Sequence, residues 1–118
     1  PILLLDGAHN PEGAAALVTA IRDAYPSKPL VLLTAMMSNK DASGVAAQLA
    51  PLADRVIATQ VDAPRALDCQ RLAAFYGEKA QAVSDPRAAL SRARELCPQN
   101  GVLLVAGSLY LPHALGLG

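Results

Sequence analysis

The sequence of 118 residues has little of what marks several common protein classes. Tryptophan is absent, aromatic residues make up 3% of the chain, and its 10 basic residues balance 10 acidic ones. A chain with no net charge and no basic stripe lacks the electrostatic footprint that binding to nucleic acid or to an anionic membrane requires. No apolar run approaches the ~18 residues that a membrane-spanning helix needs. We therefore expect neither a nucleic acid nor a membrane among its partners.

Cysteine is also scarce. Cys69 and Cys97 have neither the spacing of metal ligands nor a Cys-x-x-Cys arrangement. Each falls on a predicted helix beside apolar neighbours, which indicates small buried side chains and no special reactivity. Two thiols of this kind fit a cytoplasmic origin.

The common phosphate-binding loops are missing. A Walker A loop needs Gly-Lys-Ser/Thr, which occurs nowhere, and the dinucleotide fingerprint needs three glycines where the first loop offers only Gly7 and Gly13. A phosphotransferase of the haloacid-dehalogenase type needs a second Asp two residues after Asp6, where Ala8 stands. The chain begins at Pro1 with neither an initiator Met nor a signal sequence, so we expect a piece of a longer protein.

What is abundant is aliphatic: 53% of the residues are hydrophobic, chiefly Ala, Leu and Val, which is ample for one core. The length fits one domain, residues 1–118, because domain sizes peak at ~100–150 residues. Short apolar runs alternate with helical periodicity. Strands are predicted at 2–5, 30–34, 55–59, 81–83 and 102–105, and helices at 11–25, 45–50, 67–76 and 86–96. Repeated strand–helix units predict an α/β fold of the Rossmann-like type, a mostly parallel sheet with helices on both faces, and leave the strand order open.

The first loop is the strongest candidate for chemistry. Four apolar residues before Asp6 predict a strand buried on both faces, while Asn10 is a good N-cap and Pro11 suits the first helical position. His9 thus lies in a loop that enters a helix N-terminus, where backbone N–H groups and the helix dipole favour anions. Ligands of open α/β sheets bind outside the carboxyl ends of the strands. The alternative is a plain connection in which Asp6 caps the helix and His9 is solvated.

Polar residues also follow the other strands, at the same expected edge of the sheet. Lys40 and the candidate N-cap Asp41 follow the second strand, and Arg65 follows the third. After the last strand, Gly107 lets the backbone approach a ligand closely and Ser108 offers a hydroxyl. Each has a structural alternative, as a solvated cation or a helix cap. Their common position nevertheless favours one binding site.

Four segments resemble the carboxy-terminal domain of the folylpolyglutamate synthases, members of the Mur ligase superfamily that in bacteria often double as dihydrofolate synthases. The segments are Asp6–Pro11, Asn39–Asp41, Ala63–Ala66 and Gly107–Tyr110, and their order and flanking strands agree along essentially the whole chain. The resemblance implies ATP-dependent amide formation. A folate or dihydropteroate carboxylate is phosphorylated to an acyl phosphate, which the amine of L-glutamate attacks.

The same resemblance implies a partner within the same chain. A larger amino-terminal domain would supply the P-loop, the folate pocket and most of the ligands of Mg²⁺, so no metal ligand is expected here. The missing Walker A loop is consistent with that division. We expect a monomer whose carboxy-terminal piece is inactive alone.

Site roles follow from the matching positions. Asp6 and Asn10 are assigned to ATP, and His9 to the neighbourhood of the γ-phosphate and the incoming glutamate. There an imidazolium or N–H donor would stabilise the charge that develops, which makes His9 the catalytic residue.

Glutamate binding is assigned to His9 together with Ser108, Lys40 and Arg65, whose guanidinium suits a carboxylate. The chain departs from the family pattern at three places. Asn39 stands where Asp is common, and 111–114 replaces a Gly-Glu-Val-Arg-like stretch. A family Arg that contacts ATP would precede the first residue.

Two alternatives stay open. One is the carboxy-terminal domain of a muramyl amino-acid ligase, with a peptidoglycan precursor as acceptor. The other is a Rossmann-like binding module without catalysis.

Overall fold

Five parallel strands form one sheet in the computed structural model, which describes residues 1–117. The strands are β1 (Ile2–Leu5), β2 (Leu30–Thr34), β3 (Arg55–Ala58), β4 (Ala80–Ala82) and β5 (Val102–Ala106). They lie in the order β1-β5-β2-β3-β4, and every neighbouring pair is parallel. At the centre, Leu32 pairs with Leu104 on one side and with Val56 on the other. The last strand of the chain is therefore inserted between the first two.

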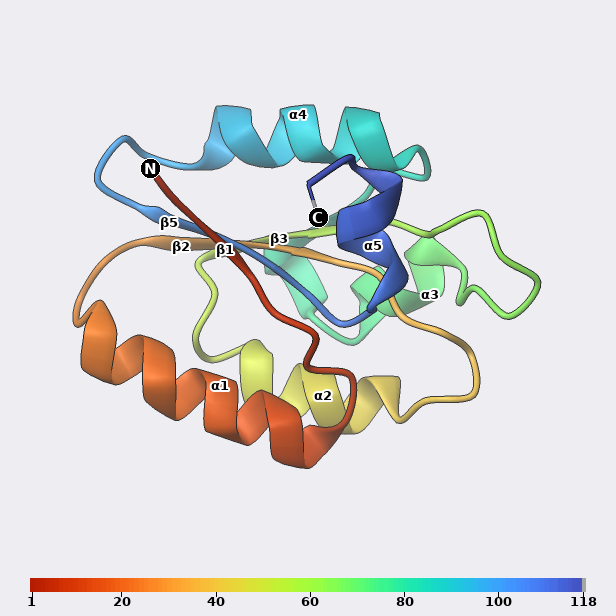
Figure 1. Ribbon diagram of the computed structural model, residues 1–118, viewed down its shortest axis with the longest axis horizontal. Coiled ribbons are helices and arrows are strands. Elements are labelled where there is room, and N and C mark those ends of the chain that lie inside the picture. Colours follow the sequence, from red (N-terminus) through yellow and green to blue (C-terminus); the bar gives the residue numbers. More distant parts are fainter. Residues whose placement is uncertain (118) are drawn as a thin grey trace.

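Helices cover both faces of this sheet, as the alternating pattern predicts (Figure 1). They are α1 (Pro11–Ala24), α2 (Ala42–Leu49), α3 (Cys69–Ala74), α4 (Pro86–Leu96) and α5 (Tyr110–Ala114), with a 3₁₀ turn at Gly77–Lys79. In Figure 1, α1 and α2 lie below the sheet and α4 lies above it. Among residues 1–117, no helix has the length and apolar content to span a bilayer.

The two faces bury different residues of the same strands. Side chains alternate along a strand, so Leu32 packs with Leu17 of α1 and Leu49 of α2, whereas Leu33 packs on the other face with Ala89 of α4. The central strands β2 and β5 are buried along their whole length. The two strands that end at the candidate site are therefore fully covered by helices and neighbouring strands.

The path of the chain opens a crevice at the carboxyl ends of the strands. After β1, β2 and β3 the chain continues into α1, α2 and α3 on one face, whereas after β4 and β5 it continues into α4 and α5 on the other. The connections therefore diverge on both sides of β5, which lies between β1 and β2. Such a change of side is where open α/β sheets bind ligands.

Helix starts follow the predicted caps. The side chain of Asn10 accepts from the N–H of Gly13 at 2.7 Å, and Asp41 accepts from Gly44 at 2.9 Å. Asp85 caps α4 in the same way, and α1 and α4 both have Pro in the first turn. These bonds satisfy N–H groups that a helix leaves unpaired at its start.

The prediction that residues 2–5 are buried on both faces is wrong. Leu3 and Leu5 are 40% and 41% exposed, while Ile2 and Leu4 pack against the core. The reason is that β1 is an edge strand of the described sheet, and on one face the helices leave it uncovered. A run of four apolar residues does not distinguish an edge strand from a central one.

One predicted helix is shorter than expected, and one helix was not predicted. The helix expected over 67–76 spans only Cys69–Ala74, because Asp68 caps it and the N–H of Leu67 donates instead to the carbonyl of Met36. The helix α5 was not expected at all. Its proline, Pro112, lies in the first turns, where a missing N–H is tolerated.

Candidate functional site

The loop after β1 is held by its own polar groups. Asp6 Oδ1 accepts from the N–H of Ala8 at 2.8 Å, and the N–H of Asp6 donates to the carbonyl of Val105 at 3.0 Å. Asp6 therefore shapes the turn and does not cap α1, which Asn10 caps. Its second carboxylate oxygen makes no hydrogen bond within the described residues.

His9 is half-buried and its ring is oriented by a backbone contact. Nδ1 lies 2.7 Å from the carbonyl oxygen of Gly7. A carbonyl accepts only, so Nδ1 carries the proton and donates it. A neutral His9 ring then presents Nε2 as an acceptor, and a protonated ring presents it as a donor. This hydrogen bond therefore holds the ring in one orientation, unlike that of a freely solvated side chain.

The loop after β5 brings Ser108 against the end of β2. Gly107 has φ +109, and a Cβ at this position would lie 2.6 Å from the carbonyl oxygen of Ala35, so only glycine fits. Ser108 is 3% exposed, and its Oγ accepts from the N–H of Tyr110 at 3.1 Å. The proton of the Ser108 hydroxyl is left free to donate to a ligand.

These two loops and the loop after β2 meet around a cavity of ≈ 150 Å³. Its wall contains His9, Met37, Lys40, Gly107, Ser108, Leu109 and Tyr110. The structure thus brings together three of the predicted glutamate-binding residues from three separate loops. An ammonium, a hydroxyl proton and a protonated imidazole can each donate to a carboxylate or phosphoryl oxygen.

The remaining predicted residues lie outside this wall. Arg65 is exposed, and its carbonyl accepts from the N–H of Ser38 at 2.6 Å, beside an antiparallel bridge between Met37 and Ala66. The backbone of Arg65 is therefore fixed next to the Lys40 loop, although its side chain does not line the cavity. Asn10 is also exposed, with its side-chain oxygen occupied by the cap.

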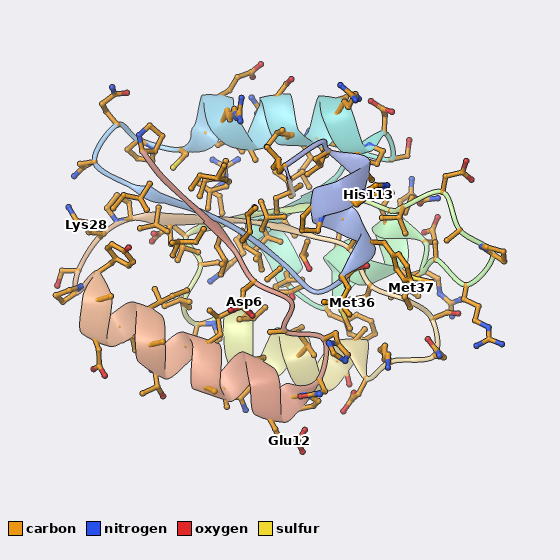
Figure 2. The ribbon with its side chains drawn as sticks, viewed as in Figure 1. Asp6, Glu12, Lys28, Met36, Met37 and His113 are labelled. Carbon is orange, nitrogen blue, oxygen red and sulfur yellow. The ribbon has the colours of Figure 1, made fainter. Side chains whose placement is uncertain are left out.

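Sequence reasoning gave no role to Met37, Leu109 or Tyr110. Leu109 and Tyr110 are 65% and 61% exposed, which is unusual for apolar side chains of this size. Figure 2 shows Met37 at the same end of the sheet as His113 of α5, with Lys28 at the opposite end. The available signal was position alone, because Met37 shortly precedes Lys40 and Leu109 directly follows Ser108.

The cysteines are structural, as predicted. Cys69 and Cys97 are buried, and burial raises the pKa of both thiols; beside Cys69 the Asp68 carboxylate raises that pKa further. A raised pKa leaves little reactive thiolate. Within residues 1–117, no group of three or more His, Cys, Asp or Glu side chains is arranged to hold a metal ion.

Comparisons with known proteins agree with this geometry. The family model for the Mur ligase, glutamate ligase domain matches residues 1–109. A curated dihydrofolate synthase/folylpolyglutamate synthase from Mycobacterium tuberculosis is 38% identical over 79 residues, which are 67% of this chain and 16% of the relative.

Solved structures extend the match to nearly the whole chain. The Mycobacterium tuberculosis folylpolyglutamate synthase complexed with ADP and AMPPCP aligns over 95% of this chain and 28% of its own, with TM-score 0.87 and 30% identity. A bifunctional folylpolyglutamate synthase/dihydrofolate synthase with Mn, AMPPNP and L-glutamate bound aligns over 98% of this chain and 28% of its own, with TM-score 0.90 and 28% identity. This chain therefore spans less than a third of each relative's length.

Proposed function

This chain belongs to the family of Mur ligase glutamate ligase domains, and on that premise we propose that it is the carboxy-terminal part of an ATP-dependent folate–glutamate ligase. The acceptor we propose is folate or dihydropteroate, and the amine substrate is L-glutamate. The relatives named above are synthases of this kind, which supports the proposal over a muramyl ligase with a peptidoglycan precursor as acceptor.

The observation that carries the proposal is the convergence of Lys40, Ser108 and His9 on one cavity. Glutamate is an anion at neutral pH, and Lys40 supplies a compensating positive charge at the mouth. Ser108 already accepts from Tyr110, so its own proton is available to donate to a ligand. We assign a carboxylate of L-glutamate to this pair. Arg65 is assigned to the outer part of the same substrate, because its backbone is fixed beside the Lys40 loop.

His9 is proposed as the catalytic residue. Because Nδ1 is hydrogen-bonded to Gly7, only Nε2 is left to bind a substrate, and a protonated ring would donate from it. Negative charge grows on the substrate oxygens when the amine attacks an activated carboxyl group. A preorganised donor at that point stabilises the transition state more than the ground state.

ATP is proposed to lie beside Asp6 and Asn10. The free oxygen of Asp6 suits a ribose hydroxyl, and the amide nitrogen of Asn10 is still available to donate. ATP supplies the activating phosphoryl group when it is bound. The described residues hold no acidic cluster for Mg²⁺, so we assign that ion mainly to the amino-terminal P-loop domain.

We therefore propose that this amino-terminal domain, in the same polypeptide, is the partner of this chain. The whole ligase is proposed to be a cytoplasmic monomer. A cavity of ≈ 150 Å³ is smaller than the ~300 Å³ at which small-molecule pockets begin, so it forms one wall of a site. The isolated chain should release no phosphate from ATP above background. Turnover by the purified isolated chain that disappears in Asp6→Ala would contradict this division of labour.

The test of the function is acceptor dependence in the full-length ligase. Phosphate release should require ATP, L-glutamate and dihydropteroate or a folate together, and the product should gain the mass of one glutamyl residue. Release that depends instead on a nucleotide-sugar peptide would establish the muramyl alternative. Tight nucleotide binding without any acceptor-dependent release would establish the binding module.

A further inference from the structure

The side chain of Leu109 crosses from the loop after β5 to the loop after β1. Its end rests on Gly7, where an added Cβ would lie 2.6 Å from Leu109 Cδ2 and 3.9 Å from Leu109 Cγ. Apart from the two chain neighbours of Gly7, no other described residue has an atom within 4 Å of that position. Leu109 is therefore the residue that packs on this side of Gly7.

Gly7 is also the residue that orients His9, because its carbonyl oxygen accepts from Nδ1 at 2.7 Å. The peptide between Gly7 and Ala8 is held at its nitrogen, since the Ala8 N–H donates to Asp6 Oδ1 at 2.8 Å. One hydrogen bond holds one atom of that peptide but leaves its plane free to tilt. Glycine has the widest backbone freedom of any residue, so the contact with Leu109 is needed to restrict that tilt.

Leu109 is well placed to restrict Gly7 because its own backbone is held in a turn. Ser108 Oγ accepts from the N–H of Tyr110 at 3.1 Å, and Leu109 lies between these two residues. Its side chain is 65% exposed and contributes little to the hydrophobic core. A substitution at Leu109 therefore changes a local contact between two loops of the cavity and leaves the core intact.

We propose that Leu109 is a positioning residue for His9. Its packing on Gly7 keeps the Gly7 carbonyl directed at Nδ1, and the ring then keeps Nε2 free for a substrate. Leu109 thus fixes the catalytic ring relative to Ser108, the residue that precedes it in the chain. The effect on catalysis rests on the proposed function, because it requires that His9 acts in the ligase reaction. The effect on the ring itself does not.

The first experiment observes the His9 ring by nitrogen NMR in full-length ligase that contains isotope-labelled histidine. The His9 signals are identified by their absence from His9→Ala. At alkaline pH the histidine ring is neutral, and the chemical shifts of its nitrogens tell which of them carries the proton. Wild type should carry it on Nδ1, whereas Leu109→Ala should give a mixture of both forms.

Two further variants serve as controls in the same measurement. Leu109→Met keeps an apolar side chain of similar volume over Gly7, so its spectrum should match that of wild type. Leu3→Ala removes the side chain of another exposed leucine, at the amino end of β1, and should also leave the His9 signals unchanged.

The second experiment measures kcat at saturating ATP and L-glutamate. Leu109→Ala should lower kcat by about threefold to tenfold, a part of the roughly 10²-fold that one preorganised donor supplies. The KM for ATP should stay within about twofold of wild type. In the double variant, Leu109→Ala should cause no further loss beyond that of His9→Ala, because a residue that acts through the ring has no effect once the ring is gone.

Several results would overturn this role of Leu109. If Leu109→Ala leaves the proton on Nδ1, or if wild type does not carry it there, the contact does not orient the ring. A further fall of kcat in the double variant would show that Leu109 acts without His9. A Leu109→Met or Leu3→Ala variant as altered as Leu109→Ala would show that packing on Gly7 is not the cause. If the wild-type ligase shows no glutamate-dependent turnover, the proposed function fails, and the NMR spectra alone decide the positioning.

Discussion

Replacing Ser108 by alanine in the full-length ligase should weaken glutamate binding selectively. The structure leaves the Ser108 proton free to donate, and Lys40 lines the same cavity. A hydrogen bond to a charged group contributes about 1.5–3 kcal/mol. Since each 1.4 kcal/mol is about tenfold in affinity, the KM for L-glutamate should rise by at least about tenfold.

Ser108→Ala also removes a bond within the protein, and this cost must be kept apart from binding. Ser108 Oγ accepts from the N–H of Tyr110, a residue that is 61% exposed. Water can replace that acceptor, so the free energy of unfolding should fall by no more than about 1 kcal/mol. The thermal midpoint would then move by a few degrees at most, and the protein stays folded in the assay.

The assay is initial-rate phosphate release with L-glutamate varied at saturating ATP, and then with ATP varied at saturating L-glutamate. Ser91→Ala, at an exposed position of α4, is the matched control for the same chemical change. A glutamate KM within about twofold of wild type, or an equal rise in the KM for ATP, would refute the assignment of Ser108.

Further predictions concern catalysis, helix termination and pH. His9→Ala should lower kcat by roughly 10²-fold, the effect of deleting one preorganised donor, and a kcat within about twofold of wild type would contradict that role. Lys79 Nζ donates to the carbonyls of Ala50 and Ala53, at 2.8 and 2.9 Å, just after the end of α2. Lys79→Met should therefore lower the free energy of unfolding, measured by urea titration, by about 1–3 kcal/mol. The control variant Lys28→Met should change it little. Burial raises the pKa of Tyr76 above its ordinary value of 10.0, so the unfolded chain loses this proton at a lower pH than the folded chain. The free energy of unfolding should therefore fall as the pH rises above 10.0, by up to about 1.4 kcal/mol per pH unit. Tyr76→Phe should flatten this alkaline decline, and an equally steep decline in the variant would contradict the assignment.

Local rules predict this fold well because most of its signals are local. Caps at Asn10, Asp41 and Asp85 depend on a side chain and an N–H group three residues later. The alternation of buried runs with helical periodicity likewise needs no knowledge of the partner strand. The predicted mostly parallel sheet with helices on both faces is confirmed for the same reason.

What the sequence left open depends on contacts between distant residues. The exposure of Leu3 and Leu5 follows from the position of β1 at the edge, which no residue near them encodes. The cavity joins His9, Lys40 and Ser108 only because β5 enters between β1 and β2. The positions of these residues after successive strands predicted a common edge of the sheet and the resemblance assigned their roles, but neither gave the strand order that joins them in one cavity. Arg65 was named both from its position after a strand and from the resemblance, but it is not among the residues that line the cavity.

The insertion of β5 also governs when this domain can assemble during synthesis. Among the described residues β1 pairs with β5 alone, and Ile2 meets Val102 across almost the whole chain. Until the ribosome has released β5, the strand that leads to Asp6 has no partner in the sheet and two edges remain open. Pairings of such high contact order form slowly and expose strand edges to aggregation. A nascent chain cut short before residue 102 should therefore be a substrate for chaperones and proteases.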